Sequence, residues 1–151
     1  MGPDQTDRKI LRQLQRNADT SLDALSEQVG LSRNACWRRI KRMEESGLIK
    51  SRVALLDAAR LGLSLTVFIQ VRAARHSAEW SARFASVTRA LPQITGVYRM
   101  SGDLDYLIRA AVADMVDYDR LYQKLISQVD MADVSASFVM EDIKHTTELP
   151  L

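Results

Sequence analysis

The sequence predicts an α+β protein of two domains, with helices first and a mixed unit of strands and helices after them. Up to about residue 50 the apolar residues recur at helical spacing, whereas from Leu65 onwards they alternate as they do in strands. Two of the first helices are joined by a tight glycine-containing turn, the pattern of a helix-turn-helix. The C-terminal order is βαββαβ, typical of a ferredoxin-like antiparallel sheet with helices on one face. We therefore expect a (winged) helix-turn-helix domain over residues 1–60 and a ferredoxin-like domain over residues 61–151.

Two amphipathic helices open the chain. The first, over residues 4–17, begins with acidic side chains, which the partial positive charge of a helix N-terminus favours. The second is capped by Ser21 and closes at Gly30. Its apolar positions, Leu22, Leu25 and Val29, have the spacing of one buried helix face.

The stretch Leu31–Ile49 predicts a third helix that is buried on one side and cationic on the other. Ser32 is a suitable N-cap, and Gly47 supplies the stop. The buried stripe consists of Cys36, Ile40 and Met43, and the opposite face carries Asn34, Arg38, Lys41 and Arg42. This pattern favours a helix that reads nucleic acid, and the alternative is an ordinary helical hairpin with a solvated basic face.

Specific DNA contacts can be assigned to the basic residues by their place on this helix. The first turns of a reading helix meet base edges, so we assign Arg33, Asn34, Arg38 and Arg42 to the bases. We assign phosphate contacts to Arg39, Lys41, Lys50 and Arg52. The last two lie in Leu48–Leu56, which has room for a strand beside the helix, as in a winged or strand-extended helix-turn-helix. Trp37 is expected to pack on the first helix rather than on DNA.

The second domain should place four strands and two helices in a fixed order. A sheet that is covered on one face leaves the other for a partner, which predicts a homodimer. A glycine- and aspartate-rich turn, Ser101–Asp105, joins two of the strands. The first expected strand begins at Leu65, and the other three cover about residues 95–100, 106–112 and 134–140. The expected helices run from Trp80 to Leu91 and from Tyr118 to Val129.

Charge and composition narrow the function classes. Residues 1–60 carry 12 Lys/Arg against 8 Asp/Glu, whereas residues 61–151 carry 9 against 11, so the basic charge lies in the first domain. The single cysteine excludes an intramolecular disulfide and a cysteine-based metal site. Its position on the buried stripe favours packing. His76 and His145 have no partner at metal-ligand spacing, so we predict no metal and no cofactor.

Targeting and membrane signals are also missing from the sequence. The N-terminus has no apolar run of a signal peptide, and no apolar stretch is long enough to span a bilayer. We therefore expect a cytoplasmic protein with no membrane partner. The sequence contains no evident nucleophile–base set or glycine-rich phosphate loop, so it is not expected to be an enzyme.

Several segments together resemble the Lrp/AsnC (feast/famine) family of transcriptional regulators. They are the first-helix segment DRKIL, the GLS turn, the cysteine of the reading helix, and SGDLDYL followed by ADM. The resemblance implies that operator binding and oligomerisation respond to a small amino-acid effector, and that a homodimer assembles further, commonly to an octamer. It places the effector at Gly102, Asp103, Leu104, Asp105, Tyr106, Met115, Ser135 and Ser137.

Within the SGDLDY turn, the resemblance gives the residues distinct roles. It implies that Gly102 lets a ligand approach the backbone and that Asp103 or Asp105 meets its α-amino group. The alternative is simple turn chemistry, since Gly and Asp suit tight turns.

Two further expectations concern the effector and the operator. The segments VALLD, GLSLTVFI, HSAEW and IKHTTELP resemble a subgroup that includes cysteine-responsive detoxification regulators, which makes cysteine or a related sulfur amino acid the first effector to test. The family usually has small polar residues or proline where this chain has Arg33–Ala35, so the base preference stays open.

Competing functions are an effector-independent architectural DNA-binding protein and, less favoured, a small ferredoxin-like enzyme.

Overall fold

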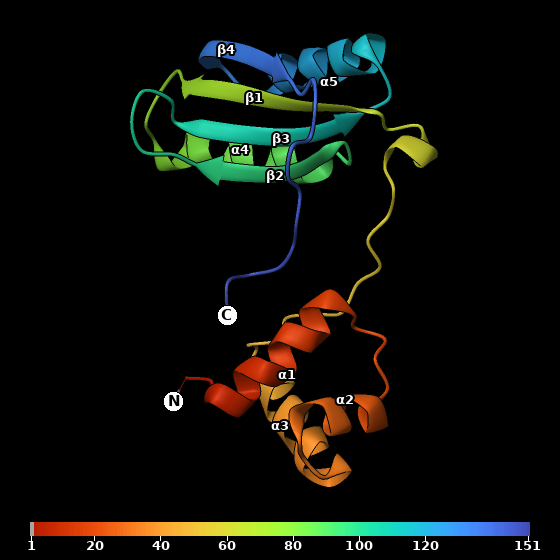
Figure 1. The fold of residues 1–151 in the computed structure, drawn as a ribbon. Coiled ribbons are helices and arrows are strands. Elements are labelled where there is room, and N and C mark those ends of the chain that lie inside the picture. Colours follow the sequence, from red (N-terminus) through yellow and green to blue (C-terminus); the bar gives the residue numbers. More distant parts are fainter. Residues whose placement is uncertain (1) are drawn as a thin grey trace. The chain divides into compact units, whose positions relative to one another are not determined.

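The computed structural model describes residues 2–151 and divides them into two compact units (Figure 1). One unit contains the residues up to Leu55 together with Ile143–Leu151, and the other is Leu56–Asp142. The C-terminal segment, expected in the second domain, therefore groups with the first. Hydrogen bonds between the first helix and the backbone of this segment explain the grouping. Arg12 Nε donates to the carbonyl of Leu151 at 2.8 Å, and the Gln15 side chain exchanges hydrogen bonds of 2.9 and 3.0 Å with the backbone of Leu149.

The first unit is built on three helices, α1 (Gln5–Arg16), α2 (Leu22–Val29) and α3 (Arg33–Glu45). The predicted caps are confirmed, because the side chains of Ser21 and Ser32 accept from backbone N–H groups of their first turns. Gly30 ends α2 with φ of 69°, a left-handed conformation that favours glycine. The buried core of this unit consists of Ile10, Leu14, Leu25, Cys36, Ile40 and Met43.

The segment with room for a wing strand, Leu48–Leu56, forms no strand in the described chain. Residues 51–57 adopt no regular structure, and only a short 3₁₀ turn, η1 (Ala59–Leu61), follows. A strand needs a neighbour to pair its backbone N–H and C=O groups, and none of the four strands described in residues 2–151 lies within this segment or pairs with it. The apolar side chains of Val53, Leu55 and Leu56 are exposed by 69–74%.

The second unit confirms the ferredoxin-like prediction. Its strands are β1 (Leu65–Ala73), β2 (Ile94–Arg99), β3 (Tyr106–Val112) and β4 (Met131–Phe138), and its helices are α4 (Ala78–Ala90) and α5 (Met115–Gln128). The sheet has the order β2-β3-β1-β4, and every neighbouring pair is antiparallel. Both helices lie on one face of this sheet (Figure 1).

Alternation along the strands fixes the two faces of the sheet. Val67, Ile69 and Val71 are fully buried in the core between the sheet and the helices. The residues between them, with Leu107 on β3 and Tyr98 on β2, lie on the helix-free face. No helix among residues 2–151 is long and apolar enough to cross a membrane.

Candidate functional site

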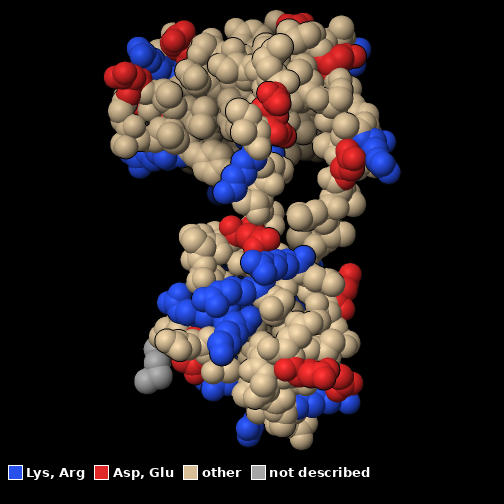
Figure 2. Space-filling model, in the orientation of Figure 1, with Lys and Arg blue, Asp and Glu red and all other residues tan. Residues whose placement is uncertain are grey.

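The outer face of α3 is the first candidate site. Cys36, Ile40 and Met43 bury one side of the helix, so its opposite side faces solvent. On that side Asn34, Arg38 and Lys41 are exposed and have no hydrogen-bond or ion-pair partner from their side chains in the part of the chain that the structure describes. Figure 2 shows a group of Lys and Arg side chains on the visible face of the first unit, over the place where Figure 1 draws α1. The outer face of α3 presents donors and positive charge to a polyanion.

Two of the predicted DNA contacts, Arg39 and Arg42, pair with carboxylates of α1 instead of standing free. Arg39 Nη1 donates to Asp4 at 2.7 Å and to Asp7 at 2.8 Å, and Arg42 Nη2 donates to Asp7 at 2.6 Å. The side chain of Asp7 is only 2% exposed. The backbone N–H of Asp7 and the Arg39 guanidinium together lower the pKa of Asp4, and the two carboxylates raise the pKa of Arg39.

The other predicted cations have looser surroundings. Arg33 lies 3.3 Å from Asp23 and Arg52 lies 2.9 Å from Glu44, and all four side chains are substantially exposed. Such surface ion pairs contribute about 0–1 kcal/mol to the stability of the fold, so a DNA phosphate can replace the carboxylate as the partner of the arginine. Lys50 is exposed and has no ion-pair partner within residues 2–151.

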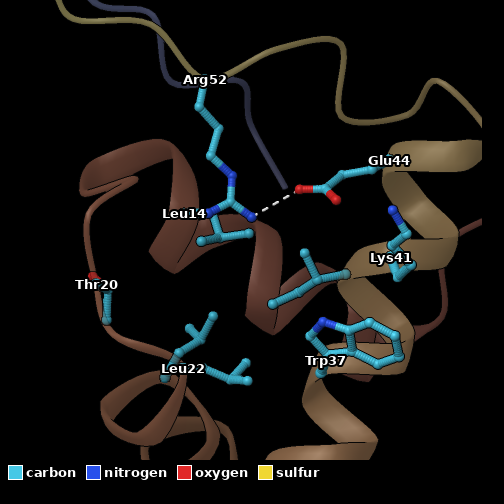
Figure 3. A pocket seen from close by; sticks show the side chains of 9 residues that line it. Leu14, Thr20, Leu22, Trp37, Lys41, Glu44 and Arg52 are labelled. Atoms are coloured by element: carbon cyan, nitrogen blue, oxygen red, sulfur yellow. Dashed lines mark hydrogen bonds and ion pairs between the residues drawn. The ribbon is translucent and has the colours of Figure 1, made fainter.

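Trp37 lies on a flank of α3 rather than in the core, with 53% of its surface exposed. Figure 3 shows it beside a pocket of about 180 Å³ that is also lined by Leu14 of α1, with the Arg52–Glu44 ion pair nearby. The indole therefore borders α1 across a partly open pocket. The pocket was not expected from the sequence.

The turn before β3 is the second candidate site. Asp105 accepts a hydrogen bond from the backbone N–H of Ala73 at 2.8 Å, and its other oxygen lies 2.8 Å from His76 Nε2. The bond to His76, followed by that to Ala73, lowers the pKa of Asp105. Gly102 has φ of 110°, which a side chain would strain. The turn is thus closed onto the end of β1, with the Asp103 side chain exposed and Leu104 half-buried.

The remaining predicted effector residues are dispersed. Tyr106 packs its ring in the core against Trp80 and Phe84, at centroid distances of 5.6 and 4.5 Å. Met115 follows β3 whereas the turn precedes it, so about 23 Å of strand separates them. Ser135 and Ser137 lie on the helix-free face, where Ser135 Oγ is 3.4 Å from Gln70 Oε1. One chain does not bring these eight residues into a single pocket.

The second unit also contains a hollow of about 370 Å³ between the start of α4 and the end of α5. Trp80 Nε1 donates to the Asp130 carbonyl at 2.6 Å and Arg83 Nε donates to the Gln128 carbonyl at 2.5 Å across it. The signal that could have found it is the pairing of Trp80 and Arg83 one helical turn apart. Its lining is polar, from Arg75, Ser77, Glu79, Trp80, Arg83, Ser127, Gln128, Val129 and Asp130.

Comparison with known protein families identifies both parts of the chain. Residues 3–50 match a winged helix-turn-helix DNA-binding family, and residues 66–149 match the Lrp/AsnC ligand binding domain. This chain belongs to the Lrp/AsnC family. It is a DNA-binding transcriptional regulator with a ligand-binding domain.

Individual relatives cover nearly the whole chain. The glutamate uptake regulatory protein of Zymomonas mobilis is 49% identical over 148 residues, which are 98% of this chain and 90% of that protein. The DNA-binding transcriptional activator DecR of Escherichia coli is 46% identical over 149 residues, 98% of each chain.

Two solved structures resemble this chain along its length. An AsnC family transcriptional regulator from Agrobacterium tumefaciens has a TM-score of 0.94 and 49% identity, covering 97% of this chain and 96% of that one. The transcriptional regulator NMB0573 of Neisseria meningitidis, in a complex with L-Met, has a TM-score of 0.93 and 36% identity, with the same coverage.

Proposed function

We propose that this regulator works as a homodimer, assembling further to an octamer, and reads a roughly palindromic operator in the cytoplasm through two copies of α3. The observation that carries the proposal is the outer face of α3, where Asn34, Arg38 and Lys41 stand exposed on a helix buried along its other side. Two-fold related reading helices require half-sites about one helical turn of DNA apart, or multiples of that.

Within this interface we assign base contacts to Asn34 and Arg38, with Arg33 beside them. Asparagine can bind adenine and arginine can bind guanine through paired hydrogen bonds. Lys41, Lys50 and Arg52 are assigned to phosphates, which give affinity without sequence information. Arg39 and Arg42 differ from the others because carboxylates of α1 already hold them.

Two surfaces that carry large apolar side chains support the homodimer. The helix-free face of the sheet includes Leu107 and Tyr98, and Tyr98 is 50% exposed in the single chain. The extended segment with Val53, Leu55 and Leu56 also leaves large apolar side chains in solvent. Large apolar side chains that gather in solvent on a single chain mark a protein–protein interface. A second copy with the same two surfaces would cover them symmetrically.

We propose that a small amino acid is the effector and that it binds at the turn Ser101–Asp105. The L-Met complex of the Neisseria relative supports an amino acid, and the family's sulfur-responsive subgroup makes cysteine the first one to test. Asp103 is the exposed carboxylate of the turn and is assigned to the α-amino group, whereas Asp105 holds the turn in place. Because Met115, Ser135 and Ser137 lie apart in one chain, residues of neighbouring subunits would have to complete the pocket.

The proposal is tested first at α3. Arg38→Ala should weaken binding to an operator duplex about ten- to a hundredfold, because it removes a base contact worth about 1–3 kcal/mol. Fluorescence anisotropy titration of the full chain measures this. Arg120→Ala on α5, an exposed arginine of the other unit, is the matched control and should bind as the unchanged protein does. If the Arg38 variant binds the operator as tightly as the unchanged protein, the outer face of α3 is not the DNA-binding site.

The effector assignment is tested by thermal unfolding with each of the twenty amino acids, starting with cysteine. A ligand of the native state must raise the melting temperature. Asp103→Asn should lose that rise and keep DNA binding. A flat response to all twenty would favour the competing function, an architectural DNA-binding protein without an effector. A ferredoxin-like enzyme is the weaker competitor, since it would have no use for the basic α3.

A further inference from the structure

A buried carboxylate joins α1 to the flank of α3. Asp7 is 2% exposed and accepts hydrogen bonds from Arg39 at 2.8 Å and from Arg42 at 2.6 Å. It also accepts from the backbone N–H of Asp4 at 3.2 Å, and its own N–H donates to the Asp4 carboxylate at 2.7 Å, so the pair forms the capping box of α1. Asp7 therefore caps α1 and forms ion pairs with two arginines of α3.

The geometry of α3 separates this flank from the outer face. At about 100° per residue, Arg39 and Arg42 project toward α1, whereas Asn34, Arg38 and Lys41 project outward. The charges of Asp4, Asp7, Arg39 and Arg42 sum to zero. Although Arg42 is 62% exposed, its guanidinium is therefore electrostatically matched before any DNA arrives.

We propose that Asp7 is a positioning residue for DNA recognition: it holds α3 in place and withholds Arg39 and Arg42 from the phosphates, so that the outer face alone meets DNA. Moving either guanidinium to a phosphate would take one of its two ion-pair partners from the buried carboxylate of Asp7, which is costly. Fewer free cations lower the sequence-independent part of DNA binding, which depends on phosphate neutralisation. Asp7 would in this way raise the ratio of specific to non-specific binding.

The test is Asp7→Asn in the full chain, which keeps the side-chain size and an acceptor oxygen but removes the charge. Affinity is measured against salt for a random-sequence duplex and for a duplex selected from a random pool. We expect tighter binding to the random duplex, with the slope of log K against log salt steeper by about 0.9 for each arginine released. The selected duplex should gain less, so the specificity ratio falls.

Two controls separate positioning from net charge. Glu27→Gln removes one negative charge from the same unit at an exposed residue without a salt bridge in the described chain, and it should leave the slope unchanged. Adding Arg42→Gln to the Asp7 variant should cancel the gain due to Arg42. A folded Asp7→Asn variant with an unchanged slope, or with weaker binding to both duplexes, would overturn the proposal.

Folding of the variant is followed by circular dichroism. If Asp7→Asn does not fold, the single variant Arg42→Gln still tests the proposal. The proposal requires that its salt slope equal that of the unchanged chain, and a slope shallower by about 0.9 would show that Arg42 binds a phosphate. The proposal rests on α3 as the reading helix. That premise fails separately, if Arg38→Ala has no effect.

Discussion

At the scale of one residue, Asp105 shows how a carboxylate in the candidate effector turn can form its hydrogen bonds within the fold. It closes the turn onto the end of β1 through Ala73 and lies against His76. The same interactions make its protonation part of the folding equilibrium. Because the pKa of Asp105 is lower in the folded chain, its contribution to stability is present above the unfolded value of about 3.9 and is lost as pH falls through the folded pKa.

Asp105→Asn should therefore be less stable than the unchanged chain by a constant margin above about pH 5. The margin should shrink as the pH is lowered below about 4, where the native carboxylate takes up a proton. Thermal unfolding between pH 2.5 and pH 6 measures the margin. Asp103→Asn, an exposed carboxylate in the same turn, is the control and should show no such margin. A margin that stays constant down to pH 2.5 would contradict this role for Asp105.

At the scale of secondary structure, local signals predicted most elements and failed where a partner is needed. Ser21, Ser32 and Gly30 act within one turn of helix, so their caps could be recognised in the sequence. Strand alternation likewise placed β1 and β3. The wing strand could not be decided locally, because a strand exists only when another pairs with it. Its β-branched and apolar residues indicated a strand, but the described chain supplies no neighbour.

The exposed face of α3 could be predicted from the sequence, but the ion pairs of the arginines on its flank could not. Charge and periodicity identified the exposed face of α3, with Arg38 and Lys41 on it. The pairing of Arg39 and Arg42 with Asp7 joins residues that lie 32 and 35 positions apart in the chain. Charge alone cannot distinguish an arginine that faces solvent from one that faces a carboxylate of another helix. The effector residues raise the same difficulty, since the contact of the Tyr106 ring with Phe84 joins residues that lie far apart in the chain.

At the scale of the whole molecule, dimerisation through the helix-free face of the sheet can be tested directly. Leu107→Asp places a charge at the middle of that face, where it pairs across from Gln70 and Tyr98. A charge buried without a partner is costly, so we expect a monomer at concentrations where the unchanged chain is a dimer. Sedimentation velocity measures the change.

Operator affinity should fall in the same variant, because two linked reading helices gain from effective concentration and one does not. Ser127→Asp, on the exposed side of α5, introduces the same charge on the opposite side of the sheet and is the control. A Leu107→Asp protein that remains a dimer would place the interface elsewhere, with the exposed segment around Leu55 as the next surface to test.

The chain carries a built-in reporter of motion in its DNA-binding unit. Its only thiol, Cys36, is fully buried in the core of the helices, and burial also raises the pKa of Cys36. An alkylating reagent can react only when α3 parts from its neighbours and the thiol ionises in water. The labelling rate of the native protein therefore counts openings of this unit alone, because the sheet unit contains no cysteine. Followed with and without DNA, that rate measures how firmly the operator holds α3 closed.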